Sequence, residues 1–317
     1  MILSLVVALY AAVVALVLAP AMRRAEWVER APARGLWAWM ALSWTLVVSA
    51  ALIVVSLCLG VLASRTPLQA SVAMCLRALT GQAGLSCAVL VSLSLLGFVG
   101  GAARLLLVLT RKTWHAHQVR RQQASALNLL GRTDHELGIV VLDDHRAAAY
   151  CLPGRHRRIV LTTAAYERLT PAQLHAVLAH EHAHLRGKHA LLNTLGTLPS
   201  RLLPGLPATR DAAETIHRLL EYRADDAACR HSHRLTLAEA LLALGTPASA
   251  PALNAAGTAT AARITRLLAT PTTTGPRLGV IVIAAAAVLT GPVLLTATTA
   301  ALAVPANACS LVGMLPC

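Results

Sequence analysis

The stretch Leu178-Ala179-His180-Glu181-His182-Ala183-His184 carries the strongest structural and chemical signal in this 317-residue chain. It follows Thr170-Pro171, where Thr suits the N-cap of a helix and Pro suits its first position. On a helix, His180 and His184 are four residues apart, so both imidazoles lie on one face within reach of one Zn²⁺. Glu181 projects beside them, where a carboxylate can act as a general base. The stretch therefore predicts a catalytic zinc centre on a helix.

A catalytic zinc normally has three protein ligands and keeps one position for water. A longer zinc pattern has its third His where Ala190 stands, and His189 is one residue short, so this His is disfavoured as a ligand. Better candidates are Glu221 and Asp225, four residues apart on a second predicted helix. One carboxylate can bind the metal while the other accepts the free ring N–H of a ligand His. His217, one turn before Glu221, is a candidate for transition-state support, although a residue on the helix face is the simpler interpretation.

The chain as a whole is unusually apolar, with 56% hydrophobic and 13% charged residues. Soluble domains carry about 25% charged residues, and this composition also excludes disordered, collagen-like, coiled-coil and small disulfide-rich proteins. Crossing a bilayer takes roughly 20 apolar residues. Four stretches are long enough, at about residues 1–22, 35–64, 85–110 and 278–304. We therefore predict a mainly α membrane protein with four transmembrane helices, whose zinc protease domain (residues 111–277) is inserted between the third and fourth.

Basic residues flank these stretches unevenly. Four follow the first stretch and four open the segment after the third, whereas the loop after the second has only two: Arg23, Arg24, Arg30 and Arg34; Arg111, Lys112, Arg120 and Arg121; Arg65 and Arg77. Because cytoplasmic loops are richer in Lys and Arg, both termini are expected outside a plasma membrane, with the protease domain in the cytoplasm. A cleaved signal peptide ending at Ala19-Pro20-Ala21 is disfavoured, since the basic residues follow the apolar run rather than precede it.

The segment 111–277 holds all 13 His, 21 of the 28 Lys and Arg, and 12 of the 14 Asp and Glu. Its first part, residues 111–136, is a basic run that we expect to leave the membrane as a helix. Such a run suits anionic lipid or water better than nucleic acid, so no direct nucleic-acid partner is expected. Runs at 138–142, 147–152 and 158–163 predict a small sheet, whose last strand is expected to hold an extended substrate by edge pairing.

Later parts of the chain are less informative. Residues 235–244 are typical of a helix. Residues 260–269 suit a basic amphipathic helix, which packs on the protein surface or lies on the inner leaflet, and a self-cleavage site is the other interpretation. Four of the seven Cys fall on the predicted external side, where a disulfide can form or where they stay unpaired: Cys75, Cys87, Cys309 and Cys317. Spacing does not select a pairing among them.

HEHAHLRGKH (180–189) followed by EYRADDAA (221–228) resembles the gluzincin pattern of integral-membrane metallopeptidases, H-E-x-x-H followed by E-x-x-A-D. AYCLPG (149–154) and IVLT (159–162) add to this resemblance. With three predicted spans before the domain and one after it, the chain is similar to the BlaR/MecR-type antirepressor peptidases.

The resemblance implies a cytoplasmic α+β gluzincin-type domain that binds one Zn²⁺ through His180, His184 and Glu221. It implies that Glu181 is the base and that Asp225 holds a zinc ligand from behind. The substrate class that it implies is a cytoplasmic transcriptional repressor of the winged-helix kind. Members that sense β-lactams carry a large external penicillin-binding domain after the last span, whereas here only residues 305–317 follow, with no S-x-x-K acylation site. We therefore expect no β-lactam input.

Three classes of function fit these observations. The first is a signalling peptidase that cuts a repressor, with the lipid bilayer and a cytoplasmic protein as its partners. The second is an HtpX-type protease for quality control of membrane proteins, which would cut unfolded substrates broadly. The third is a zinc-stabilised membrane receptor without activity. The intact Glu181 argues against the receptor, because a structural zinc site needs ligands but no base.

Overall fold

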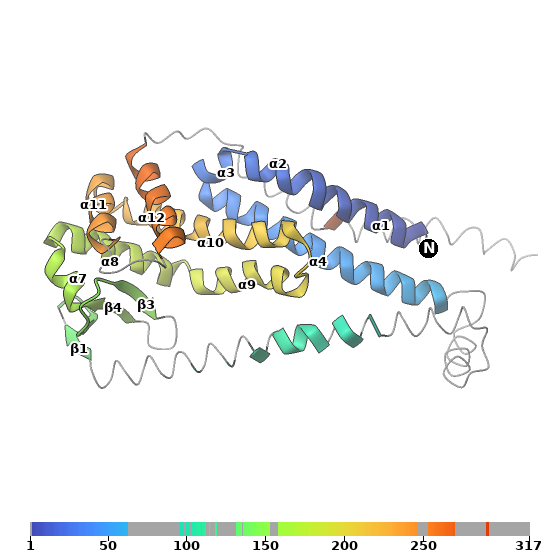
Figure 1. Ribbon diagram of the computed structural model, residues 1–317, viewed down its shortest axis with the longest axis horizontal. Coiled ribbons are helices and arrows are strands. Elements are labelled where there is room, and N and C mark those ends of the chain that lie inside the picture. Colours follow the sequence, from blue (N-terminus) through green and yellow to red (C-terminus); the bar gives the residue numbers. More distant parts are fainter. Residues whose placement is uncertain are drawn as a thin grey trace, which may run out of the picture.

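The computed structural model (Figure 1) describes residues 2–62, 96–97, 99–101, 103–108, 110–111, 114, 118, 131–134, 136–152, 158–245, 253–269 and 290–291. Most of the predicted third span, nearly all of the fourth and the four external Cys lie outside the described residues. The described cysteines Cys151 and Cys229 are free thiols.

The N-terminal region forms two long apolar helices. The first runs continuously through α1 (Ile2–Val13), the π-helical turn η1 (Val14–Leu18) and α2 (Ala19–Arg24). Pro20 has no N–H and its ring crowds the preceding turn, so a widened turn just before it relieves the helix. The short α3 (Trp27–Arg30) leads into α4 (Pro32–Leu62), which begins at a proline.

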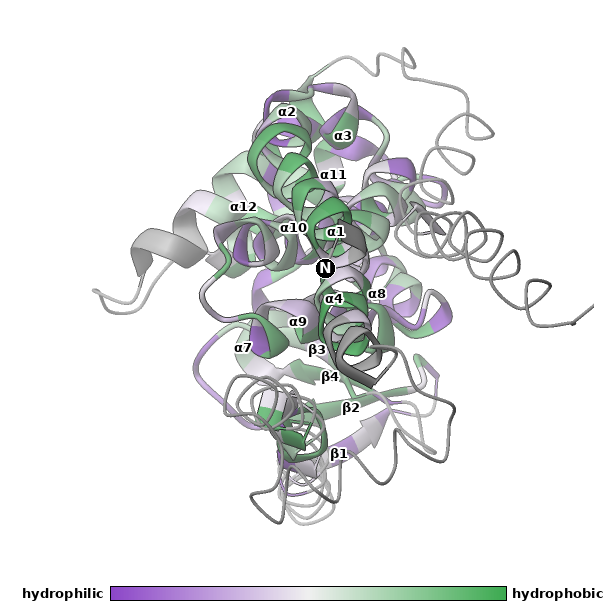
Figure 2. Ribbon diagram, turned by 90° about the vertical axis from the view of Figure 1, so that its right-hand side faces the viewer, coloured by the Kyte–Doolittle hydropathy of each residue, from purple (hydrophilic) through white to green (hydrophobic). Residues whose placement is uncertain are grey.

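Two windows in these helices, Ser4–Arg24 and Pro32–Ser56, are long and apolar enough to cross a membrane. Large apolar side chains such as Leu5, Leu9 and Leu16 are exposed along the first, and Figure 2 shows the hydrophobic colouring of α1 and α4. These features give weak support to membrane association, because buried core helices and signal sequences share the same length and composition.

A four-stranded sheet opens the protease segment, as the β-rich runs predict. Its strand order is β1-β2-β4-β3, with β2 and β4 parallel and the other neighbours antiparallel: β1 (Gly131–Asp134), β2 (Ile139–Leu142), β3 (Ala149–Leu152) and β4 (Arg158–Thr162). The helix predicted for residues 111–136 is wrong at its end, where β1 forms. Asp134 Oδ1 accepts the N–H groups of Glu136 and Leu137, and Gly138 has φ +66°, so this turn chemistry builds a hairpin instead.

The predicted role of the strand over 158–163 needs two corrections. The strand ends at Thr162, because the Thr162 hydroxyl accepts the N–H of Ala165 and caps α7 (Thr163–Arg168). It also pairs with β2 on one side and with β3 on the other, so none of its edges is available to a substrate. In the described sheet the edge beside the zinc motif belongs to β3 instead.

Five further helices complete the segment: α8 (Pro171–Arg186), α9 (His189–Leu202), α10 (Pro207–Ala228), α11 (Arg234–Gly245) and α12 (Leu253–Leu268). The predicted start of α8 is confirmed, with Thr170 and Gln173 forming a reciprocal capping box. Helix α8 packs on β3 and β4, while α10 packs on α8, α9 and α4.

The core of the protease segment is continuous with the N-terminal helices. Leu36 and Trp39 of α4 are fully buried in one cluster with Ile216 and Leu219 of α10. A Cβ on Gly196 of α9 would lie 2.6 Å from Ile216 Cγ2, so glycine is what allows α9 and α10 to approach closely. Helix α10 is therefore fixed on both sides, and it carries the predicted carboxylates to α8.

Candidate metal centre

Three metal-binding groups converge where α8 crosses α10. The Nε2 atoms of His180 and His184 are 3.0 Å apart. Glu221 places Oε2 at 3.6 Å from His180 Nε2 and Oε1 at 3.5 Å from His184 Nε2. One donor atom from each of the three residues lies within 4.8 Å of the others. Two imidazoles and one carboxylate are a donor set typical of catalytic zinc, which keeps a fourth position for water.

This donor set opens into a cavity of about 460 Å³. Glu181 is buried and lines the cavity next to the two histidines. Strand β3 also lines the cavity and brings the Cys151 thiol close to the Glu181 carboxylate. Burial and the Glu181 charge raise the pKa of the Cys151 thiol to about 12, so this group stays protonated at neutral pH. The carboxylate of Glu181 is therefore the basic group on this side of the cavity.

Asp225 lies on the other side of the His180 ring from Glu221. Its Oδ1 is 3.0 Å from His180 Nδ1, and the residue is 0% exposed. Glu221 faces the Nε2 side of the same ring. A hydrogen bond from Nδ1–H to Asp225 fixes the tautomer in which Nε2 has the lone pair that a metal needs.

His189 contacts the Nδ1 side of His184, as Asp225 contacts the Nδ1 side of His180. Helix α8 ends at Arg186, Lys188 adopts a left-handed conformation with φ 49°, and the turn places His189 as the first residue of α9. His189 is 4% exposed, and its Nδ1 lies 2.9 Å from His184 Nδ1. A Cβ on Gly187 would come within 2.5 Å of the His189 ring, so the turn leaves no room for a larger residue. His189 is thus outside the donor set, but it contacts one of its members.

Arg263 is the site residue that sequence reasoning missed. It lies on α12, in the region expected to form a surface helix or a cleavage site. Its guanidinium donates to both carboxylate oxygens of Asp225 at 2.9 and 2.6 Å, and it lies 3.2 Å from Glu221 Oε2. Three residues later, Arg266 makes the same paired contact with Asp226 at 2.7 and 2.8 Å. The signal in the sequence was the presence of two basic residues, Arg263 and Arg266, that could pair with the two adjacent acidic residues Asp225 and Asp226.

These contacts set the charge state of the site. Burial opposes charge on each group, yet hydrogen bonds from His180 and His184 and the Arg263 charge keep the pKa of Glu221 well below its usual range. Asp225 is likewise held ionised by His180 and Arg263, which outweigh burial and lower its pKa. Burial also disfavours protonated His180, but hydrogen bonds to Asp225 and Glu221 raise its pKa to about 9. The site is therefore built to hold a cation between fixed carboxylates.

His217 is the one predicted site residue that the structure does not bring to this group. It is exposed on α10 and is not among the residues that line the cavity. One turn of helix separates it from Glu221, but the buried face of α10 at this level is formed by its neighbours Ile216 and Leu220. Its placement corresponds to the simpler interpretation, a residue on the helix face.

Comparison with known proteins agrees with the chemistry of this donor set. Residues 111–215 match the sequence model of peptidase family M48, whose members are zinc metalloproteases. The match covers roughly a third of the chain and includes His180, Glu181 and His184, whereas Glu221 lies after its end. Searches among curated proteins and solved structures found no match. The M48 match over residues 111–215 and the His-His-Glu donor set together indicate that this chain is a metalloprotease.

Proposed function

We propose that this protein is a membrane-anchored zinc endopeptidase that cuts a cytoplasmic transcriptional repressor in response to an external signal. The observation that carries the enzymatic part is the combination of Glu181 with the His180, His184 and Glu221 donor set in one cavity. A purely structural zinc site would not need a buried, cavity-facing carboxylate beside its ligands. The regulatory part rests on the resemblance to the BlaR/MecR-type peptidases.

Each site residue has a distinct role in this proposal. His180, His184 and Glu221 hold one zinc ion, while Asp225 orients His180. When bound, the zinc supplies a Lewis acid that polarises the scissile carbonyl and makes water acidic enough to be activated near neutral pH. Glu181 accepts the proton of the attacking water at its carboxylate and then delivers it to the leaving amine.

The substrate backbone is proposed to lie along β3. In the described sheet this strand has one neighbour, β4, and its residues Ala149, Tyr150 and Cys151 form a wall of the cavity. An extended peptide that pairs with a free strand edge gains backbone hydrogen bonds largely independent of its side chains. The sequence preference of the enzyme would then depend on the substrate side chains that enter the cavity.

We place the protease domain in the cytoplasm, with both termini outside and four helices crossing the plasma membrane. The basic residues that follow the first apolar helix and the two apolar N-terminal helices support this orientation. Labelling of single introduced cysteines with a membrane-impermeant thiol reagent in intact cells tests it. If cysteines introduced in the 111–277 segment are labelled from outside the cell, the proposed orientation is wrong.

The function itself is tested with the full-length protein in a mild detergent. Bound zinc and proteolysis are measured for the wild type and for Glu181→Gln, with a winged-helix repressor encoded nearby and with unfolded casein as substrates. We expect both proteins to hold about one zinc per chain and only the wild type to cut, with the repressor preferred. Preference for casein would favour HtpX-type quality control. Zinc binding without any cutting, also in the presence of membranes from induced cells, would favour a receptor.

A further inference from the structure

A second cavity lies against another face of α8, away from the metal centre. Its volume is about 310 Å³, and five basic residues line it: Arg186, His189, Arg223, Arg230 and His231. None of its lining residues is acidic. The cavity lined by Arg23, Arg24 and Arg218 differs in this respect, because Glu26 and Glu29 also line it.

Among the described residues, no ion pair joins Arg186, Arg223 or Arg230 to a carboxylate. All 14 Asp and Glu residues of the chain lie in the described ranges. The ion pairs go to other arginines, namely Arg23, Arg30, Arg218, Arg263 and Arg266. Basic residues near a helix C-terminus complement the helix dipole, which accounts for Arg186 and Arg230. It does not account for Arg223, which lies within α10 well before its end at Ala228.

The floor and one wall of this cavity also suit an anion. Ala179, Ala183 and Ala227 are small, so the space between the arginines stays open. The N-terminus of the 14-residue helix α9 lies at this wall, since its first residue is His189. The first turn of α9 has no acidic residue and its N-cap, Lys188, makes no side-chain cap. Uncapped N–H groups and the positive end of the dipole therefore add to the charge of the arginines.

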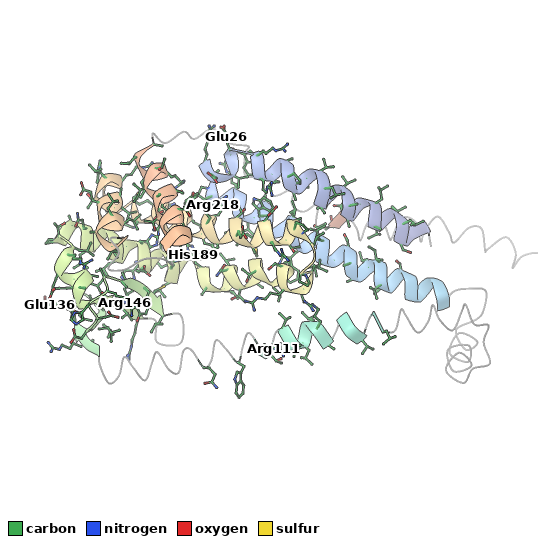
Figure 3. All side chains as sticks on the ribbon, viewed as in Figure 1. Glu26, Arg111, Glu136, Arg146, His189 and Arg218 are labelled. Carbon is green, nitrogen blue, oxygen red and sulfur yellow. The ribbon has the colours of Figure 1, made fainter. Side chains whose placement is uncertain are left out.

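We propose that this cavity binds a phosphate group, carried either by a phospholipid headgroup or by a soluble phosphate compound. Arginine forks bind a tetrahedral oxyanion through paired N–H···O bonds, and a phosphate offers enough oxygens for several guanidinium groups at once. The volume fits a group of this size rather than a folded partner. His189, which Figure 3 labels, lines this cavity. Its ring also contacts His184, so the bound phosphate lies one side chain away from a predicted zinc ligand.

The test uses full-length protein and inorganic phosphate as the probe, with chloride at matched ionic strength as the reference. Binding is followed by calorimetry and by the shift of the unfolding temperature. The informative variant is the double substitution Arg223→Gln/Arg230→Gln. Its matched control is Arg201→Gln/Arg210→Gln, which removes the same charge from exposed positions on α9 and α10 outside the cavity. Should the informative variant fold poorly in chloride, Arg230→Gln alone replaces it, because that residue is exposed and follows the helix end.

We expect saturable phosphate binding by the wild type and the control. The double cavity variant should bind at least about tenfold more weakly, since it loses the charge-assisted hydrogen bonds of two guanidinium groups. A parallel arm measures flotation with vesicles of phosphatidylcholine alone or with added phosphatidic acid. A cavity-dependent gain with phosphatidic acid assigns the site to a lipid headgroup, whereas calorimetric binding alone assigns it to soluble phosphate. Absence of saturable binding in both arms overturns the proposal. Equally weakened binding in the cavity and control variants also overturns it. So does unchanged binding in the cavity variant, which is the result expected if phosphate binds to the metal instead.

Discussion

The two cavities beside α8 contain similar cations but differ in how those cations are balanced. In the metal centre, His180, His184 and Arg263 face Glu221 and Asp225 at hydrogen-bonding or ion-pair distances. In the second cavity the lining contains three arginines and two histidines but no carboxylate. The difference teaches that the first site is organised around fixed anions that attract a metal cation. The second is organised around fixed cations that attract an anion from outside the chain.

The largest expected effect concerns Glu181, the proposed base of the metal centre. Glu181→Gln keeps the shape of the side chain but removes its ability to accept a proton, so kcat/KM should fall by about 10²- to 10⁴-fold. Bound zinc, measured by mass spectrometry, should stay at the wild-type level. Glu221→Gln should lose both activity and zinc, because it changes a ligand. The exposed Glu167 of α7 offers a control, Glu167→Gln, that should change neither. Equal zinc loss in the Glu181 and Glu221 variants would contradict the division of roles.

A smaller effect is expected where the balance of charge itself is broken. Asp225→Asn removes the fully buried carboxylate that pairs with Arg263, whose side chain is 13% exposed. Leaving a buried charge without its partner costs about 3–5 kcal/mol of unfolding free energy, and losing the group behind a metal-bound His weakens zinc binding about 10- to 100-fold. Denaturant unfolding and competition with a chelator measure the two effects.

The double variant Asp225→Asn/Arg263→Gln sharpens this prediction. Part of the lost stability should return, because no unpaired charge remains buried, while the zinc affinity should stay low. An additive loss of stability would mean that Arg263 is held mainly by other contacts.

The pH dependence of stability in the metal-free protein should show opposite contributions from His180 and His189. The pKa of His180 is about 9, above its unfolded value of about 6.5. Protonated His180 therefore contributes fully to the unfolding free energy below pH 6.5, and this contribution is lost as the pH rises through 9. Burial, followed by the charges of His184 and Arg223, lowers the pKa of His189 to about 4. Stability therefore also falls as the pH drops from 6.5 towards 4, because the unfolded chain takes up a proton that folded His189 refuses.

The unfolding temperature in chelator should thus be highest near pH 6.5. Substitution His189→Gln should flatten the acidic side of this profile and leave the alkaline side in place. Added zinc should reduce the alkaline dependence, since it replaces the proton on His180. A profile that stays flat between pH 6.5 and 9 without metal would contradict the charge balance inferred for His180.

The sequence alone predicts much of the metal centre but little of its surroundings. The spacing within α8 brings His180, Glu181 and His184 together because helical periodicity is local. The E-x-x-A-D run on α10 likewise supplies Glu221 and Asp225. Arg263 could not be placed, because its role depends on how α12 returns to α10, a long-range contact that periodicity does not encode. The same limit explains the wrong assignment of the substrate edge, since strand order in a sheet does not follow order along the chain.

His189 shows a finer limit of sequence reasoning. Its distance along the chain excludes it from the usual third-ligand position, and the structure agrees. Nevertheless, the left-handed turn at Lys188 folds the chain back and brings the ring to His184 from behind. A pattern of ligands describes the groups that touch a metal, whereas the residues behind them depend on turns such as this one.

The smallest expected effects test the comparison of the two cavities most directly. An Arg→Gln substitution should destabilise the protein at Arg266, which has an ion pair, but not at Arg223, which has none among the described residues. Arg266→Gln removes a two-pronged ion pair with Asp226 and the contact of the guanidinium with the Tyr222 ring at 4.9 Å. Because Asp226 is partly exposed, we expect a loss of about 1–2 kcal/mol in unfolding free energy.

Arg223→Gln removes no ion pair and relieves repulsion from Arg186 and Arg230, so stability in chloride should stay within about 0.5 kcal/mol or rise. Both values come from the same denaturant titration. In saturating phosphate the order should change, because wild type and Arg266→Gln gain stability from the bound ligand while Arg223→Gln gains less. If Arg223→Gln instead destabilises the protein in chloride as much as Arg266→Gln does, the second cavity is held together by its arginines. The contrast between balanced and unbalanced charge would then fail.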